Sequence, residues 1–322
     1  MILLACVSSA YAQLDVVNFT VTDGISDSQV KAAMERGVSL LLSTCNSTII
    51  SGRSKIKFEK GDEKSVFTKD GFGILEDLWT TSAMMCPVST VKEKCIGSSD
   101  GTYQIRNIPV TMLAADDDHA EQELVVCFNS VGQIDNILIA MEEQKYMDVI
   151  NAGIGVKDLN QRESIVDFVE NFRTAYNRKD LDYISNVFSD NALIITGKVI
   201  KVKNQGDLSM QTLTQEQIQY QKSTKSEYIA NLKKCFKNNA YINLTFDEIE
   251  VMRHPKRNDI YGVTLKQHWN SSNYSDVGYL FLMINFEDEL NPSIQVRTWQ
   301  PDKYNGKPLP REEVFSLDMF NI

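Results

Sequence analysis

The chain is predicted to be an α+β protein built from two consecutive domains, and three observations support this prediction. It has 322 residues, which exceeds the roughly 100–200 residues of one ordinary domain. Each half shows helical periodicity followed by four strand-like runs between turn signals. The stretch "DVINAGIGVKDLN" separates the halves. We therefore expect domains over residues 22–147 and 161–302, joined by a linker over 148–160.

The first half begins with a helix that is capped near Ser26 or Asp27 and runs to about Thr48. Its apolar residues recur at helical spacing: Val30, Met34, Val38, Leu41 and Leu42. A second helix is expected from Asp70 to about Ser82. Four strands are expected after it, over 86–96, 102–113, 121–129 and 132–141.

The second half has a similar order of elements. Helices are expected over 161–176, 181–188 and 226–237, with a strand over 192–202 before the third helix. Strands are then expected over 241–253, 260–271, 274–287 and 293–300. A tail over 303–322 should dock on the fold through its apolar residues: Val314, Phe315, Leu317, Met319 and Phe320.

The two halves therefore end alike, with a helix and then four strands. From Thr81 to Ile134 the numbering advances by 53, and from Lys237 to Ile294 it advances by 57. This spacing predicts that the halves are copies of one fold. Sequence identity between them is negligible, and the first half is expected to lack the short second helix.

The stretch "NRKDLDYISNVFSDNALIITG" (177–197) resembles a recurrent passage of the nuclear transport factor 2-like superfamily, also called SnoaL-like or cystatin-like α+β. The short helix is expected to be locked to the core by Leu181, Ile184 and Phe188, and Ala192 must be small where helix and strand approach. The resemblance covers residues 160–300 well and 27–141 loosely. It implies two tandem cone-like domains, each a curved antiparallel sheet wrapped around helices, with the first copy degenerate.

Members of this superfamily that are enzymes use the open end of the cone for isomerisation, dehydration or epoxide opening. Such chemistry needs a carboxylate or a His–Asp pair in an apolar pocket, often with a tyrosine donor. Strand alternation places five pocket candidates on the concave face of the second domain: Tyr176, Gln267, Trp269, Asp276 and Thr298. It places four others on the outer face: His268, Tyr279, Arg297 and Trp299.

None of these residues forms a complete catalytic set, so no catalytic residue is assigned. Asp276 follows a hairpin turn, where a solvated carboxylate, more than about a third exposed, is expected. The leading interpretation is an exported, non-catalytic binding or scaffold protein with a small-ligand pocket in the second domain. The alternatives are a SnoaL-like isomerase, dehydratase or hydrolase that transfers protons on an apolar small molecule, and a structural homodimer formed through sheet faces.

Composition and motifs argue against several other functions. The net charge is −10 and the pI about 5.0, which disfavours nucleic acid as a partner because phosphates need clustered cations. The sequence lacks glycine-rich phosphate loops and Gly-x-Ser-x-Gly elbows. "ADDDHAE" (115–121) lacks the glycine and distal glutamate of a calcium loop. We therefore expect no cofactor and no metal.

The first residues, "MILLACVSSAYAQ", indicate export. A signal peptide over 1–12, with a truncated or wrongly assigned start, would be cleaved after Ala10-Tyr11-Ala12. A lipid anchor on Cys6 is the rival interpretation, so the protein is expected in the periplasm or at the cell surface. No later run has the ~18 apolar residues of a membrane span.

Five cysteines remain after Cys6, which is an odd number. They are expected to be buried thiols, or to include a Cys86–Cys95 or Cys86–Cys127 bridge.

Overall fold

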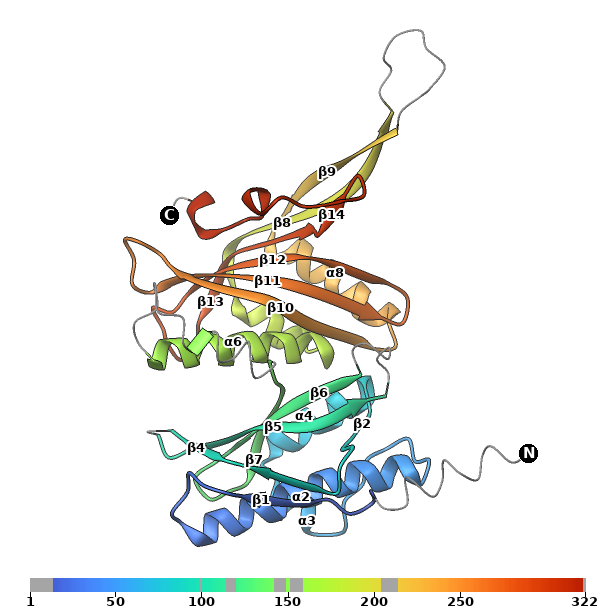
Figure 1. Ribbon diagram of the computed structural model, residues 1–322, viewed down its shortest axis with the longest axis vertical. Coiled ribbons are helices and arrows are strands. Elements are labelled where there is room, and N and C mark those ends of the chain that lie inside the picture. The colour runs from blue at the N-terminus through green and yellow to red at the C-terminus, as the bar shows by residue number, and fades with distance from the viewer. Residues whose placement is uncertain are drawn as a thin grey trace, which may run out of the picture. The chain divides into compact units, whose positions relative to one another are not determined.

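The computed structural model describes residues 14–98, 100–113, 120–141, 149–150, 159–203 and 214–320. The chain is α+β, as predicted, and divides into two compact units (Figure 1). Unit 1 is Met1–Glu143 with two short segments, Asn177–Lys179 and Tyr241–Asn243, and unit 2 is the remainder. Three predicted features lie outside the described residues: the signal peptide over 1–12, most of the linker over 148–160, and Asp116–His119 of the acidic run.

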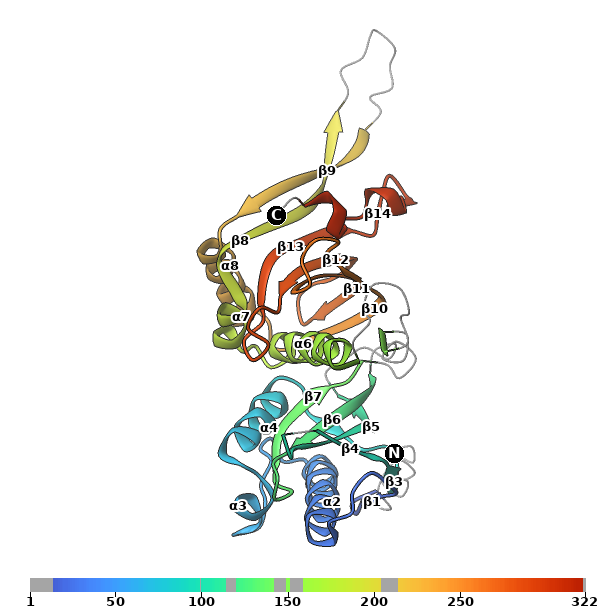
Figure 2. The same ribbon diagram turned by 90° about the vertical axis from the view of Figure 1, so that its left-hand side faces the viewer.

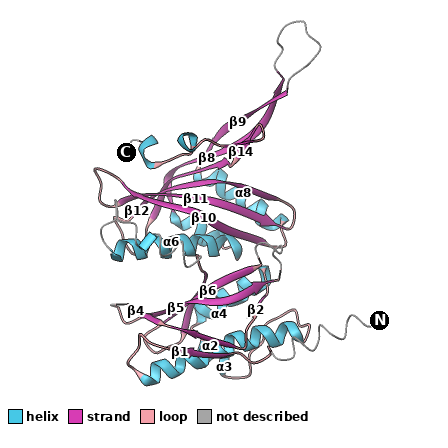
Figure 3. Cartoon of the chain, in the orientation of Figure 1, coloured by secondary structure: helices cyan, strands magenta, loops and turns pink. Residues whose placement is uncertain are grey.

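In its described residues, unit 1 has three helices and several short strands, and Figure 3 shows how they are arranged. The helices are α2 (Ser28–Ile50), α3 (Asp62–Val66) and α4 (Lys69–Thr81). The strands are β1 (Asn18–Val21), β2 (Met84–Met85), β3 (Thr90–Glu93), β4 (Cys95–Gly97), β5 (Tyr103–Met112), β6 (Glu121–Phe128) and β7 (Ile134–Ile139). One antiparallel sheet has the order β2-β5-β6-β7, with β4 paired to β5, and β1 pairs with β3 in parallel.

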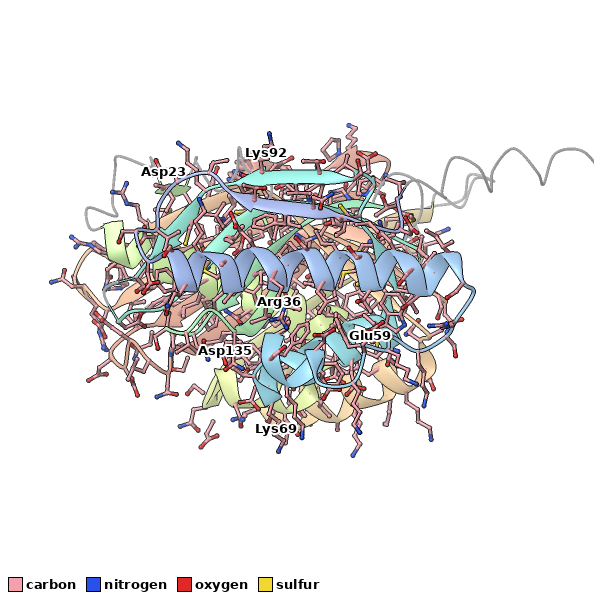
Figure 4. The ribbon with its side chains drawn as sticks, turned by 90° about the horizontal axis from the view of Figure 1, so that it is seen from below. Asp23, Arg36, Glu59, Lys69, Lys92 and Asp135 are labelled. Carbon is pink, nitrogen blue, oxygen red and sulfur yellow. The ribbon has the colours of Figure 1, made fainter. Side chains whose placement is uncertain are left out.

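One edge of β1 pairs with β3, and side chains of α2 form hydrogen bonds along its other edge. Glu35 and Ser39 accept from the backbone N–H groups of Val21 and Phe19, each at 2.9 Å. Ser43 accepts in the same way from Val17, which precedes the strand, also at 2.9 Å. Residues four apart on the helix thus meet residues two apart along β1, and these backbone donors are satisfied. Figure 4 shows α2 beside β1 and β3, with Arg36 on the helix and Lys92 on β3.

The core of unit 1 is formed where the sheet packs on the helices. Its sheet residues are fully buried and apolar: Ile105, Ile108, Leu124, Val126, Ile137 and Ile139. Met34, Val38 and Leu41 from α2 and Leu75 from α4 belong to the same cluster. Burial of this surface away from water stabilises the unit.

Unit 2 has a six-stranded sheet with the order β10-β11-β12-β13-β8-β9. Its helices are α6 (Leu159–Asn177), α7 (Leu181–Val187) and α8 (Lys225–Asn238). Its strands are β8 (Phe188–Lys203), β9 (Thr214–Ser223), β10 (Ile242–Arg253), β11 (Ile260–Ser271), β12 (Ser275–Asn285), β13 (Ser293–Pro301), β14 (Lys303–Tyr304) and β15 (Lys307–Pro308). Two 3₁₀ turns follow, η2 (Arg311–Glu313) and η3 (Leu317–Met319). Figure 2 shows the strands of this unit curving past α6, α7 and α8.

The step from α7 into β8 anchors the helices to the sheet. Asp180 caps α7 by accepting from the backbone of Tyr183 at 2.8 Å. Ile184 is fully buried, whereas Leu181, which was predicted to be buried, is only partly so. Phe188 contacts the rings of Phe172 and Tyr228, and its backbone pairs in parallel with Ile294.

Unit 1 contains a short second helix as well, so the prediction that the first half lacks one is wrong. Helix α3 has five residues, which is too short to show helical periodicity in the sequence. It leads into Phe67, which is buried and forms a parallel bridge to Ile134. Phe67 and Ile134 therefore repeat the arrangement of Phe188 and Ile294.

The C-terminal segment covers the outer face of the unit 2 sheet. Gln300 on β13 holds it by donating to the carbonyl of Glu313 and accepting from the backbone of Phe315. Leu317 is buried against Ile260 and Phe281, and the ring of Phe320 stacks on that of Phe281 at 5.4 Å. Val314 is also buried, whereas Met319 is 46% exposed. A homodimer through sheet faces stays a prediction, and this outer face is already occupied by the chain itself.

Two further findings concern cysteines and membrane spans. None of the five cysteines in the described residues is in a disulfide, so the structure contains neither predicted bridge of Cys86.

Within the described ranges, helices that are both long and apolar enough to cross a membrane are absent.

Candidate functional site

The concave face of the unit 2 sheet is defined by the register of β11, β12 and β13. Trp269 lies opposite Asp276, and Gln267 lies opposite Gly278. On the other side of β12, Leu280 pairs with Trp299 and Leu282 with Arg297. The helices lie over this face, since the ring of Tyr176 on α6 contacts that of Trp269 at 6.1 Å.

Thr298 was predicted to line this face and Arg297 the outer one, and both assignments are wrong. Alternation counted from Ile294 would place Thr298 inward. A β-bulge between Ile294 and Val296 adds one residue to β13 and reverses the alternation beyond it. Thr298 therefore pairs with Phe281 under the C-terminal segment, while Arg297 and Trp299 face the helices.

Arg297 is the central residue of the site. Its side chain is buried, with 7% of the residue exposed, and its guanidinium carbon lies 4.9 Å from the centre of the Tyr228 ring on α8. The guanidinium also interacts with the hydroxyl of Tyr176. Its Nε and Nη1 atoms are buried and have no hydrogen-bond partner among the described residues. A buried charge with unsatisfied donors is costly to the folded state.

Two tyrosines complete the helix side of the cluster. The hydroxyls of Tyr176 and Tyr228 lie 2.5 Å apart. Burial raises the pKa of Tyr176 well above its ordinary value, and the neighbouring Tyr228 raises it further. Tyr176 therefore keeps its proton and serves as a hydrogen-bond donor over the physiological pH range.

Asp276 is less exposed than its hairpin position suggested. It is partly buried opposite Trp269, and its Oδ2 accepts a hydrogen bond from the hydroxyl of Tyr274 at 2.8 Å. Its Oδ1 is buried without a partner among the described residues. Burial raises the pKa of Asp276, against the lowering effects of Tyr274 and Arg297. The expectation of a solvated turn carboxylate is corrected accordingly.

Trp299 lies against the backbone of Gly278. A Cβ atom at position 278 would fall 2.7 Å from the indole ring and 2.3 Å from the carbonyl oxygen of Gln300. Only glycine permits this approach. The indole Nε1 is buried and has no partner within the described part of the chain, so Trp299 adds a third unused donor to the two of Arg297.

The remaining candidates lie on either side of the sheet. Gln267 is buried on the concave face beside Gly278. His268 lies on the opposite face, as predicted from alternation, with its Nε2 2.9 Å from Oδ2 of Asp247. No group of three potential metal ligands occurs within the described ranges.

The concave face thus brings Arg297, Asp276 and Trp299 together with unused hydrogen-bonding atoms. Two of these residues supply donors and one supplies an acceptor. Buried polar groups in folded proteins are almost always satisfied by protein, water or ligand. The arrangement therefore suits a small polar molecule that bonds to the cation and the carboxylate.

The sequence signal that could have located Arg297 was present but was misinterpreted. Arg297 lies between Val296 and Trp299, and an arginine so close to large apolar residues is unusual for a core. Alternation alone assigned Arg297 to solvent because the bulge is not visible in the sequence.

No protein-family model matches the chain, and neither does any curated protein. Among solved structures, Bd1075 of Bdellovibrio bacteriovorus is similar at 13% identity and a TM-score of 0.33, and the match covers 54% of this chain and 51% of that one. A nuclear transport factor 2-like protein from Cytophaga hutchinsonii matches at 14% identity and a TM-score of 0.31, over 44% of this chain and 98% of its own.

A third similar structure is a protein provisionally named a scytalone dehydratase, from Novosphingobium aromaticivorans. It matches at 8% identity and a TM-score of 0.33, over 47% of this chain and 91% of its own. The order of helix, short helix, strand, helix and four strands in unit 2 is the one predicted, except that a second strand, β9, precedes α8 where no strand was expected. Unit 2 thus has the α+β element order that the resemblance to nuclear transport factor 2-like proteins implies.

Proposed function

We propose that the concave face of unit 2 binds a small molecule that carries an anionic group and a flat apolar body. The observation that carries this proposal is the buried guanidinium of Arg297, whose Nε and Nη1 have no partner among the described residues. An anion at this point would neutralise the charge and satisfy its donors. Such charge-assisted hydrogen bonds are stronger than neutral ones.

The neighbouring residues suggest the rest of the ligand. Oδ1 of Asp276 would accept from a hydroxyl or amine, and the indole N–H of Trp299 would donate to an oxygen. Trp269 and Trp299 offer flat apolar surface, which favours an aromatic ring or a conjugated body. A few placed polar groups within an apolar surround are typical of small-molecule sites.

A matched pair of probes tests this proposal. Benzoate and benzamide have the same ring, but only benzoate is an anion. Isothermal titration of the full chain should show benzoate binding at least about tenfold more tightly, because hydrogen bonds to a charged group contribute roughly 1.5–3 kcal/mol. Arg297→Gln should remove that preference.

Lys198→Gln is the control, because Lys198 is an exposed cation on β8 in the same unit. It should leave benzoate binding unchanged. Equal affinity for both probes, or a preference that survives Arg297→Gln, would overturn the proposal. Native mass spectrometry of the protein as purified offers a second readout, since a tightly held acid would appear as a fixed mass increment.

A second candidate is an enzyme that transfers protons on the same class of molecule, and Asp276 favours it. A partly buried carboxylate with a raised pKa and one unused oxygen has the properties of a general base. Phenylpyruvate is a suitable probe because it has a carboxylate, a ring and an acidic C–H beside its ketone. Exchange of that proton in D₂O, followed by NMR, should be faster than in buffer and should lose the acceleration in Asp276→Asn. No acceleration by the unaltered protein leaves binding as the function.

We also propose that the protein is exported. The support is the sequence motif Ala10-Tyr11-Ala12, which matches the small-residue rule of a cleavage site. N-terminal sequencing of protein expressed with its upstream region should find Gln13 first. Retention of Met1 on a cytoplasmic protein would contradict the proposal.

A further inference from the structure

A second site lies on unit 2, away from the concave face. It is a groove of about 400 Å³ between the β10–β11 turn and the C-terminal segment. Its lining is Met252, Arg253, His254, Pro255, Lys256, Leu317, Asp318 and Phe320. This volume is within the range of known small-molecule sites.

Both walls of the groove are held in place by contacts of their own. Leu317 is buried in the outer-face cluster, and Phe320 stacks on Phe281. On the other wall, Nδ1 of His254 accepts from the backbone N–H groups of Lys256 at 3.2 Å and Arg257 at 3.1 Å. The groove is therefore a feature of the folded unit, formed by elements that are far apart in the sequence.

The walls offer apolar surface to a ligand. Met252 is 48% exposed and lies one residue before the end of β10. Pro255, Leu317 and Phe320 continue this apolar surface along the groove. Methionine adapts its shape to flexible apolar ligands more easily than branched residues do.

Two cations of the groove lining differ from their neighbour Arg257 in their ion pairing. Arg257, the next basic residue along the chain, is paired with Asp259 at 2.5 Å. Arg253 and Lys256, in contrast, have no ion pair with any carboxylate in the described part of the chain. The lining also has one carboxylate, Asp318, which accepts from the hydroxyl of Ser316, so the two cations outnumber it. An apolar surface beside two unpaired cations complements an amphipathic anion.

We propose that this groove binds a free linear aliphatic carboxylate, such as a medium-chain fatty acid. The chain would lie against Met252, Leu317 and Phe320, and the carboxylate would meet Arg253 and Lys256. The positive charge selects the head group, and the apolar walls provide the affinity by removing the chain from water. This site is independent of Arg297 and of the function proposed for the concave face.

Three probes with the same chain length test the proposal. Decanoate, decanol and decyltrimethylammonium differ in head-group charge and are titrated into the full chain below their micellar concentrations. Decanoate should bind, and decyltrimethylammonium should bind at least about tenfold more weakly. Exposed ion pairs are worth up to about 1 kcal/mol each, so two of them account for such a difference.

Variants locate the binding within the molecule. The double variant Arg253→Gln, Lys256→Gln should weaken decanoate binding about tenfold, while Lys234→Gln on α8, which changes an exposed lysine outside the groove, should have no effect. Arg297→Gln should also leave decanoate binding intact, which separates this site from the concave face. Circular dichroism confirms that each variant is folded.

Two results would overturn the proposal. One is equal binding of the anionic and cationic probes, and the other is unchanged decanoate affinity in the double variant. Binding of an acidic peptide such as Ac-EELLEE, together with no binding of decanoate, would assign the groove to a protein partner and reject the fatty acid.

Discussion

Strands β7 of unit 1 and β13 of unit 2 have the same pairing pattern, but one has a buried isoleucine where the other has a buried arginine. Ile134 pairs with Phe128, a bulge follows, and Asn136 pairs with Cys127. Ile294 pairs with Ile284, a bulge follows, and Val296 pairs with Met283. Counted from these bulges, Ile137 of unit 1 occupies the position of Arg297 in unit 2.

The comparison separates what the fold requires from what it does not. Ile137 is fully buried opposite Val126, and Arg297 is buried opposite Leu282. An isoleucine is therefore sufficient at this position for a helix-covered sheet of this kind. The guanidinium of Arg297 adds desolvation cost without an ion pair among the described residues, so we infer that it is present for binding.

The shared bulge also bears on the origin of the chain. In both units a short helix leads into a phenylalanine, Phe67 or Phe188, whose backbone bridges in parallel to the isoleucine before the bulge. We infer from this repeated detail that the two units are copies of one ancestral fold. The hairpin of β8 and β9 comes between Phe188 and α8, whereas Phe67 leads within two residues into α4.

The largest effect is expected from placing the arginine of unit 2 into unit 1. Ile137→Arg would bury a charge in a fully apolar cluster, and its cost should exceed about 4 kcal/mol because no partner group is provided. Urea denaturation followed by circular dichroism measures this loss. Asp135→Arg, at an exposed position in the same bulge, is the matched control and should change stability by less than about 0.5 kcal/mol. A tolerated Ile137→Arg would contradict the assignment of Arg297 to function.

The next largest effect concerns the two phenylalanines. Phe188→Ala should lower the free energy of unfolding by about 3–5 kcal/mol, because a large buried ring is removed. Phe67→Ala should have a similar cost in unit 1, because Phe67 is equally buried and contacts the rings of Phe58 and Phe72. A loss below about 1 kcal/mol for either variant would mean that the phenylalanine does not anchor its short helix to the sheet.

Much of the fold could be predicted from the sequence because its signals are periodic. The helix over 161–176 and the late strands alternate clearly, and the structure has them within a few residues. Helix α3 could not be predicted, since five residues show no period. The serines of α2 at positions 39 and 43 would be expected at a solvent face, although they bond to the backbone of unit 1.

The site could be predicted only in part, for a physical reason. Tyr176, Gln267, Trp269 and Asp276 lie on the concave side, since α6, β11 and β12 are regular along these residues, and their role in a pocket stays a prediction. Arg297 and Trp299 were placed on the wrong face because one bulge reverses the alternation of β13. Bulges depend on pairing between strands and leave little trace in a single sequence.

A smaller effect is expected at Asp276 and depends on pH. Its folded pKa is raised, mainly by burial, so the folded state favours the protonated carboxyl. The protonated carboxyl of Asp276 therefore stabilises the folded protein fully below the unfolded pKa of about 3.9. This contribution to the free energy of unfolding is lost as the pH rises through the folded pKa. Asp276→Asn should therefore raise stability at pH 7 by less than about 1 kcal/mol, and the gain should vanish near pH 3. An equal effect at both pH values would indicate a cause other than ionisation.

The most direct test of the account replaces Arg297 by the residue that unit 1 has at the same position. Replacement of a buried, poorly satisfied charge by a hydrophobic residue is often neutral or stabilising by about 1–4 kcal/mol. Arg173→Ile is the matched control, because Arg173 is also buried but donates from Nε to the carbonyl of Leu244 at 2.6 Å. That variant should lose about 1–3 kcal/mol by leaving the carbonyl unsatisfied.

The measurement is the free energy of unfolding of Arg297→Ile in urea, followed by tryptophan fluorescence, to which Trp269 and Trp299 of unit 2 contribute together with Trp79 of unit 1. If Arg297 serves a ligand, the variant should be as stable as the unaltered protein or more stable, and it should no longer bind benzoate. A loss of more than about 2 kcal/mol, comparable to that of Arg173→Ile, would show that the guanidinium supports the fold and would contradict the account.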